Sequence, residues 1–281
     1  MPPKKSKSTL SHPLFNWVEQ LDELTNALSA EGADNLKDHQ LRKVRKSLFD
    51  ITGRITETIG RIDPVRQPNS VFDPSAPDVM GRMVAMALLS QPRMRLEDKA
   101  RFYGSGVYAL YYRGEFEPYA PISRKDHPIY VGKADPDLAN ARSPIEQGEK
   151  LDRRLKEHFK SISKASNLSV DDFECRFLVV VSGWQEAAER YLISLYKPVW
   201  NKETKICYGI GKHGDSASTR GNKRSPWDTL HSGRSWAGET IHDQLSEEDI
   251  RNLLATHFAQ YPPYDTREEA MDRFLEDMCQ H

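Results

Sequence analysis

The chain has 281 residues, of which 38% are hydrophobic and 29% are charged, and this composition predicts a globular protein. The formal net charge of −1 hides an uneven distribution: residues 202–236 hold seven basic and three acidic side chains, whereas residues 237–281 hold eleven acidic ones and three arginines. No apolar run approaches the roughly 20 residues that a membrane-spanning helix needs, which argues against a membrane protein.

Two further features narrow the class of protein. The first residues carry three lysines but no apolar stretch, which argues against a secretory signal. The cysteines, Cys175, Cys207 and Cys279, are far apart and form no Cys-x-x-Cys pair, so a disulfide framework and a structural zinc site lose support. We therefore expect a protein of the reducing cytoplasm.

The first third of the chain is predicted to be helical. Residues 1–12 form a basic tail, and a helical region follows over 13–95. Apolar residues recur at helical spacing over 14–28 and 41–62, which predicts two packed helices with a role in support or dimerisation. A methionine-rich helix then ends near Pro92.

The pattern changes at residue 104, within a predicted unit that spans residues 96–203. Glycines and tyrosines stand side by side in "GSGVYALYY" and again in "PIYVGKA". The expected order is strand, strand, helix, strand, helix, over 106–112, 128–132, 147–161, 173–181 and 184–197. This order predicts a compact α+β unit.

The remaining chain divides by charge. The segment 204–240 is basic and rich in glycine and serine, with little periodicity. The segment 241–281 is acidic, and Ser246 and Thr266 each begin a capping-box pattern, which predicts two closing helices.

Two predicted helices carry side chains suited to chemistry. Arg154 and His158 are four residues apart and so point the same way, although such a pair is also typical of a solvated helix face. Glu189 borders the apolar face of the next helix, where a carboxylate needs a partner or a cation. Glu189 is either a metal ligand or a boundary glutamate that pairs with a nearby basic side chain, Arg190 or Lys197. Glu186 is a competing candidate.

Taken together, these features resemble the GIY-YIG nuclease superfamily. The resemblance covers roughly residues 104–202 and ends in the motif "KPVWN". It is carried by Gly106-Val107-Tyr108, Tyr130-Val131-Gly132, Arg154, Glu189 and Asn201. The superfamily's fold is a small central β-sheet flanked by helices, in which both motif tyrosines face one catalytic surface. Here this core would carry helical N- and C-terminal additions.

The flanking sequences resemble one branch of the superfamily. "FDPSAPDVMGRMVAMALLSQPR" upstream, "HGDSASTRGNKRSPWDTLHSGRSWAG" downstream and the placement of His158 are similar to type II restriction endonucleases that cut CCGCGG. The resemblance implies Mg²⁺-dependent hydrolysis of double-stranded DNA at a GC-rich palindrome, leaving 5′-phosphate and 3′-hydroxyl ends. It also implies a cognate DNA methyltransferase and a prokaryotic cytoplasm.

The resemblance implies a role for each motif residue. Glu189 would hold one Mg²⁺ ion per active site, for which Mn²⁺ can substitute, and Arg154 would bind the scissile phosphate. Either Tyr108 or His158 would be the general base, because a phenol is a poor base at neutral pH unless its pKa falls or a histidine relays the proton. Tyr130 would position water or phosphate.

In the same scheme, Asn201 would orient groups around the metal. Lys133, directly after the second motif, is either a phosphate contact or an ordinary exposed lysine.

Base recognition would belong to the basic segment. Arginine binds guanine in the major groove with two hydrogen bonds, although basic loops often contact phosphates alone. The candidates are Arg220, Asn222, Lys223, Arg224 and Arg234. A palindromic target implies two-fold symmetry and therefore a homodimer or homotetramer, with the N-terminal helices as the expected contact.

Two other readings stay open. One is a repair or homing nuclease of the same superfamily, although no zinc-type cysteine pairs or large further domains are present in this sequence. The other is a non-catalytic DNA-binding protein, which would have no use for a carboxylate such as Glu189 beside a polyanion.

Overall fold

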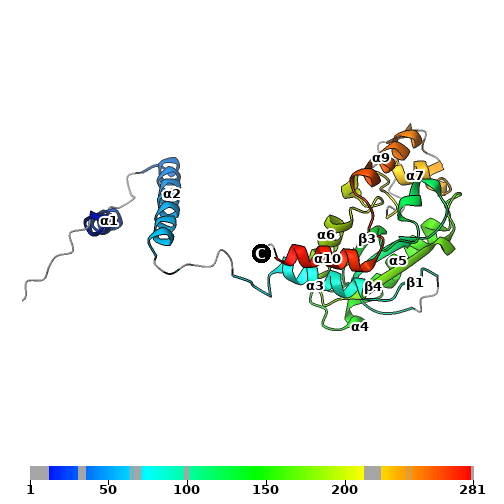
Figure 1. Ribbon diagram of the computed structural model, residues 1–281, viewed down its shortest axis with the longest axis horizontal. Coiled ribbons are helices and arrows are strands. Elements are labelled where there is room, and N and C mark those ends of the chain that lie inside the picture. Colours follow the sequence, from blue (N-terminus) through cyan, green and yellow to red (C-terminus); the bar gives the residue numbers. More distant parts are fainter. Residues whose placement is uncertain are drawn as a thin grey trace, which may run out of the picture. The chain divides into compact units, whose positions relative to one another are not determined.

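The computed structural model describes residues 13–30, 36–63, 65, 71–97, 101–211, 223–238, 240 and 242–279 (Figure 1). The chain divides into two units, residues 1–69 and 70–281, and each is described by itself. None of the helices in these described ranges is both long and apolar enough to cross a bilayer.

The first unit contains two amphipathic helices, α1 (Pro13–Ala30) and α2 (Asp38–Ile62). Both form where the apolar spacing predicts them, and α2 begins where the Gln40 side chain accepts a hydrogen bond from the Lys37 backbone N–H. The expected packing is not seen, because the apolar side chains stay exposed, with Trp17 60% and Leu24 68% exposed. The apolar faces of these two helices are therefore exposed rather than buried.

The second unit is an α+β fold, as the sequence predicts. Its strands are β1 (Met94–Arg95), β2 (Gly106–Tyr112), β3 (Pro128–Ala134), β4 (Phe173–Val179), β5 (Lys223–Arg224) and β6 (His242–Asp243). Its α-helices are α3 (Pro77–Leu89), α4 (Pro144–Gln147), α5 (Lys150–Ile162), α6 (Gln185–Tyr196), α7 (Pro226–Leu230), α8 (Ser235–Gly238), α9 (Glu247–Gln260) and α10 (Arg267–Cys279). The 3₁₀ helices are η1 (Glu117–Ile122), η2 (Val170–Asp172) and η3 (Lys202–Thr204).

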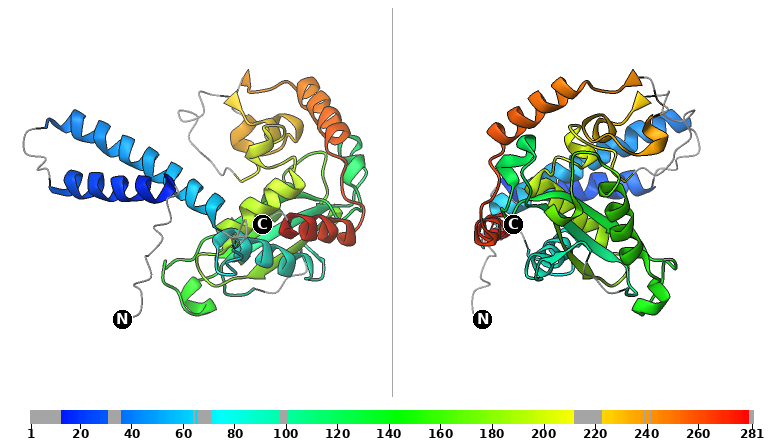
Figure 2. Two further views of the ribbon diagram at one scale, coloured as in Figure 1. Left: turned by 60° about the vertical axis from the view of Figure 1, so that its left-hand side comes forward. Right: turned by 90° about the vertical axis from the view of Figure 1, so that its right-hand side faces the viewer.

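The central sheet is antiparallel, with the strand order β1-β4-β2-β3. Strand β2 is buried along its whole length because β3 and β4 pair on its two sides and helices cover both faces (Figure 2). Strand β3 pairs with β2 on one side and forms an edge of the sheet. The motif strands β2 and β3 are therefore neighbours, as the family resemblance implies.

Alternation along β2 sends its side chains into two cores. Tyr108, Leu110 and Tyr112 face a core that includes Leu151 and Leu155 of α5. The intervening residues of β2 face a second core, built with α3 and α6. Helix α3 packs against α6, so this methionine-rich helix supports the nuclease-like core.

The basic segment is more ordered than its lack of periodicity indicates. Its described part folds around a buried aromatic cluster in which the Tyr119 hydroxyl lies 2.6 Å from His231 Nε2 and accepts a hydrogen bond from Trp200 Nε1 at 2.7 Å. Trp227 packs edge-on against Trp200. These contacts join residues 225–231 to the core of the second unit.

The two predicted closing helices are confirmed, and both begin at the expected caps. Ser246 Oγ accepts a hydrogen bond from the Asp249 backbone N–H, and Thr266 Oγ1 accepts one from the Glu269 backbone N–H. Helix α10 lies beside α3 (Figure 1), where Arg82 donates to the Asp277 carbonyl at 2.8 Å. The acidic end of the chain thus packs on the helix that precedes the sheet.

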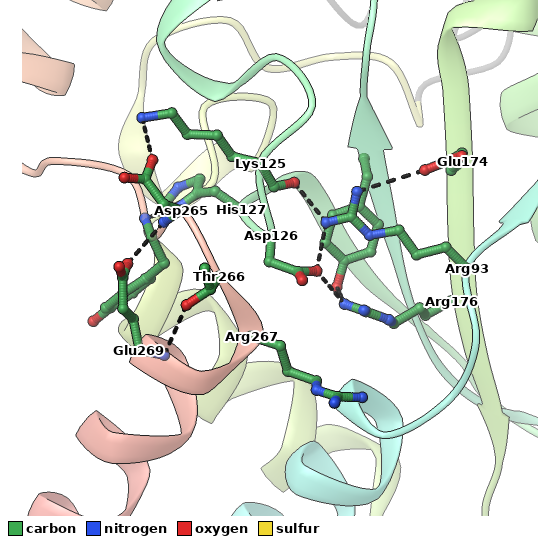
Figure 3. A network of polar contacts seen from close by, with 12 residues as sticks. Arg93, Lys125, Asp126, His127, Glu174, Arg176, Asp265, Thr266, Arg267 and Glu269 are labelled. Atoms are coloured by element: carbon green, nitrogen blue, oxygen red, sulfur yellow. Dashed lines mark hydrogen bonds and ion pairs between the residues drawn. The ribbon is translucent and has the colours of Figure 1, made fainter.

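A polar network holds the start of β3 in place (Figure 3). Asp126 accepts hydrogen bonds from Arg93 and from Arg176 of β4, the latter at 2.7 Å. Burial raises the pKa of Asp126, but these two guanidinium groups lower it overall, so the carboxylate stays charged. Lys125 pairs with Asp265 at 2.6 Å and ties the same turn to the residues before α10.

Candidate active site

The two motif tyrosines lie on the same face of the sheet. In the β2–β3 register, Tyr130 is opposite Leu110, which is two residues along from Tyr108 on the same face of β2. Their ring centroids are 6.0 Å apart. The predicted convergence of the two tyrosines is therefore present.

The motif glycines allow this approach. Gly132 is directly opposite Tyr108, and a Cβ built on Gly132 would lie 2.6 Å from the Tyr108 hydroxyl oxygen. At Gly106 a Cβ would lie 2.0 Å from the Leu178 carbonyl oxygen on β4. The second motif glycine thus makes room for the tyrosine of the first, while the first glycine permits β2 and β4 to pair closely.

Helix α5 brings His158 to the tyrosines. Leu151 and Leu155 bury the inner face of α5 against the sheet, so His158, one turn later, points at β2. Its Nε2 lies 2.7 Å from the Tyr108 hydroxyl, and its ring centroid lies 4.9 Å from that of Tyr130. His158 and Tyr108 are both almost fully buried.

Burial makes the side chains of Tyr108 and Tyr130 weaker acids than an ordinary tyrosine. It raises the pKa of Tyr108 well above its ordinary value, with a further increase from Tyr130 and an opposing effect of Arg154. Burial, together with the Glu189 carboxylate, raises the pKa of Tyr130 to about 12. In the free protein both tyrosines are therefore protonated at neutral pH.

Glu189 of α6 reaches the same site at the β3 edge. Burial raises its pKa to about 7, the nearby Lys133 opposes this effect, and Glu203 and Asp135 add to it. The Lys133 backbone N–H donates a hydrogen bond to the Glu189 carboxylate. A carboxylate that is disfavoured by burial and by other acids is suited to bind a cation.

Glu186, the competing candidate, lies differently. Its side chain is 73% exposed and lies 3.7 Å from Lys133 Nζ. The structure therefore favours Glu189 as the carboxylate of the site.

The sequence analysis did not single out Glu203, an exposed residue whose charge acts on this site. It lies on η3, directly after the Asn201 motif, and its charge acts on both Glu189 and Tyr130. Its position two residues after Asn201 was the available signal.

Arg154 stands at the exposed side of the site. Its side chain is 49% exposed, and its Nη1 donates to Glu157 at 2.9 Å. Its positive charge acts on Tyr108 and lowers that phenol's pKa. It is placed to meet a ligand that arrives from solvent beside the two tyrosines.

The Asn201 side chain bonds to the backbone of β3. Its amide accepts a hydrogen bond from the Val131 N–H at 2.9 Å and donates one to the Val131 carbonyl at 2.8 Å. The backbone N–H of Trp200 also donates a hydrogen bond to the Ile129 carbonyl. Asn201 thus satisfies the open edge of β3 between Tyr130 and Gly132, so it supports the site through the backbone.

The predicted DNA-contacting residues have different surroundings. Arg220 and Asn222 lie outside the described residues. Lys223 is exposed, and Arg224 pairs with Asp243 at 2.6 Å. Lys133 lies beside the site and pairs with Asp135 at 3.1 Å.

Arg234 is buried and has structural partners. It donates to Asp228 at 2.7 Å and to the carbonyls of Gly209 and Ile210, and its guanidinium lies over the Trp227 ring. Only 3% of the residue is exposed. The structure therefore favours a structural role for Arg234 over contact with bases. This role could not be predicted from the sequence, because folding brings the partners together.

A comparison with protein families agrees with this arrangement. Residues 100–258, more than half of the chain, match the family described as the Eco29kI GIY-YIG domain. The chain belongs to the Eco29kI GIY-YIG restriction endonuclease family. A search of curated proteins found no match.

Membership establishes the class of activity. The family consists of GIY-YIG restriction endonucleases, which bind and cut DNA, and GIY-YIG nucleases typically use a divalent metal ion. Across the described residues, no three His, Cys, Asp or Glu side chains are grouped so that they could hold a metal by themselves. A donor set built on Glu189 fits a hard cation that keeps water and phosphate oxygens as its other ligands.

Proposed function

We propose that this protein is a type II restriction endonuclease that hydrolyses double-stranded DNA at a GC-rich palindrome, with CCGCGG as its target. The products would carry 5′-phosphate and 3′-hydroxyl ends. The observation that supports this most is the hydrogen-bonded pair Tyr108–His158, which lies beside Tyr130 and within the field of Arg154.

The proton step is assigned to Tyr108 and His158 together. Because burial raises the pKa of Tyr108, its phenolate is not available in the resting protein. An imidazole accepts a proton far more readily than a phenol at neutral pH. We therefore infer that Tyr108 takes the proton of the attacking water while passing its own to His158, across the 2.7 Å contact.

Phosphate binding and metal binding are assigned to different side chains. Arg154 would bind the scissile phosphate with its guanidinium, giving up its surface pair with Glu157. Glu189 would hold a single Mg²⁺, or Mn²⁺ in its place. The ion would neutralise charge on the phosphate and the leaving 3′-oxygen. Tyr130 would position the water or the phosphate between them.

Sequence recognition is assigned to the segment that begins beside the site. A Cβ built on Gly211 would lie 4.0 Å from the Tyr130 hydroxyl, so the basic segment approaches the active site at this residue. Lys133, Arg220, Asn222, Lys223 and Arg224 are the proposed DNA contacts. Arg234 is left out because it is buried.

A palindromic target requires two active sites related by symmetry, so we propose a homodimer or a pair of dimers. Helix α2 is suited to bind a second copy. It carries apolar residues seven positions apart, a spacing typical of paired helices, and none of them is buried: Leu41, Leu48, Ile55 and Ile62. A restriction enzyme also implies a methyltransferase of the same specificity in the same prokaryotic cytoplasm.

The test uses a plasmid with one CCGCGG site and a second plasmid without it. We expect one cut in the first plasmid with Mg²⁺, none with EDTA, and none with the Glu189→Ala variant. Discrete cuts elsewhere would support a nuclease of another specificity. Intact DNA in every reaction, with binding retained, would favour the non-catalytic alternative.

A further inference from the structure

A cleft of about 360 Å³ lies beside the active site, between the end of β3 and the first turns of α5. It is lined by four basic side chains, two acidic ones and two small apolar residues: Lys133, Lys150, Arg153, Arg154, Asp135, Glu157, Ala134 and Pro136. Arg154 and Lys133 already belong to the candidate site. Lys150 and Arg153 have no role in the activity proposed above.

The cleft is basic, and its cations are held along its rim by carboxylates. Lys150 Nζ lies 2.5 Å from Asp137, which stands just beyond the lining residues. Lys133 and Arg154 have similar partners on the same rim. Such exposed pairs are weak and readily exchange a carboxylate for a phosphate. The charges are thus held toward the cleft until a stronger anion replaces the carboxylates.

The spacing of the cations matches one strand of nucleic acid. Lys150 and Arg154 are four residues apart on α5, so they lie on one side of the helix, about 6 Å apart along its axis. Successive phosphates of one DNA strand advance by about 3.4 Å along the duplex axis while winding around it. Two cations one turn apart can therefore bind neighbouring phosphates.

We propose that this cleft is a second phosphate subsite, which binds the phosphodiester next to the scissile one on the cleaved strand. Lys150 and Arg153 are its positioning residues, and Arg154 is shared with the catalytic centre. The inference rests on the proposed nuclease function, because it places the scissile phosphate at Arg154. Its chemical requirement is a polyanion with regularly spaced phosphates, which a single free phosphate does not satisfy.

The test measures DNA binding by the full chain with Ca²⁺ in place of Mg²⁺, at several salt concentrations. The probes are a duplex with CCGCGG and a duplex of equal composition without it. We expect the double variant Lys150→Ala/Arg153→Ala to bind both duplexes about 10-fold or more weakly. The slope of log affinity against log salt should fall by about 1, as for one lost phosphate contact.

Two variants make the test specific. Asp137→Asn removes the carboxylate that competes for Lys150, so it should bind DNA more tightly than the wild type. Arg95→Ala removes an exposed arginine from β1, at the other edge of the sheet, and should bind like the wild type. In cleavage assays, the double variant should raise KM while changing kcat less than about threefold.

The outcomes separate the subsite from the nuclease function. Wild-type affinity and salt slope in the double variant, with binding weakened by Arg154→Ala, would overturn the subsite and leave the nuclease intact. Equal losses in the double variant and in Arg95→Ala would also overturn it, because the effect would then be one of net charge. If the wild type bound neither duplex, the proposed function and the subsite would both fail.

Discussion

The hydroxyl of Tyr108 and Nε2 of His158 lie 2.7 Å apart in a site where both side chains are almost fully buried. The contact joins the central strand of the sheet to helix α5, across 50 positions of sequence. In the proposed mechanism, it would supply a proton acceptor to a phenol whose pKa burial raises well above its ordinary value.

This pair leads to the first prediction. Tyr108→Phe keeps the ring and its packing but removes the hydroxyl, so we expect cleavage to fall by about 100-fold or more with folding retained. Single-turnover cleavage of the CCGCGG plasmid measures the loss. Tyr112→Phe is the matched control, because Tyr112 is on the same strand and face but donates no hydrogen bond to His158; its hydroxyl accepts from the Phe116 N–H. Equal effects of the two changes would contradict the relay.

The raised pKa of Glu189 should make the stability of the protein depend on pH. Its pKa is raised from 4.5 to about 7 in the folded protein, so between these values the folded state binds more protons than the unfolded state. The contribution of this group to stability is therefore present below about pH 4.5 and is lost as the pH rises to about 7.

Glu189→Gln should remove this loss. Relative to the wild type, the variant should gain on the order of 2 kcal/mol in unfolding free energy between pH 5 and pH 8. Urea denaturation at several pH values measures it, without added metal. Glu186→Gln, one turn earlier and exposed, is the matched control. Parallel profiles for Glu189→Gln and the wild type would show that Glu189 is not the titrating group.

A variant at Asn201 tests whether this side chain supports strand β3 or orients groups around the metal. Asn201→Ala leaves the Val131 N–H and carbonyl without their partners at a buried position, which should cost about 1 to 3 kcal/mol of stability. Chemical denaturation measures the loss, and Asn252→Ala on the exposed side of α9 is the control. If activity were lost with stability unchanged, Asn201 would instead act at the metal, as the family resemblance implies.

Substitution of Arg234 should affect stability, whereas substitution of Lys223 should affect DNA binding. Arg234→Ala leaves Asp228 as a buried carboxylate without its arginine, so we expect a loss of about 3 to 5 kcal/mol of stability. Lys223→Ala removes an exposed cation and should weaken DNA binding with no change in melting temperature. Thermal melting and binding assays on both variants check this. A stable Arg234→Ala variant with altered sequence preference would restore its predicted role in base recognition.

The sequence by itself determined the elements and the family. Apolar spacing located the helices that became α1, α2, α5 and α6, and the capping residues Ser246 and Thr266 begin helices as expected. These features are local, because periodicity and caps depend on neighbours within a few positions. The tyrosine-glycine motifs likewise carry their own spacing, so the α+β fold and the nuclease family could both be predicted.

Tertiary structure decided which side chains meet. Asn201 pairs with the backbone of Val131, 70 positions away, and Arg234 pairs with the carbonyls of Gly209 and Ile210. Neither contact leaves a periodic trace in the sequence, because each depends on how distant elements pack. The choice of Glu189 over Glu186 and the basic cleft at Lys150 have the same origin, since burial and charge are properties of the folded surface.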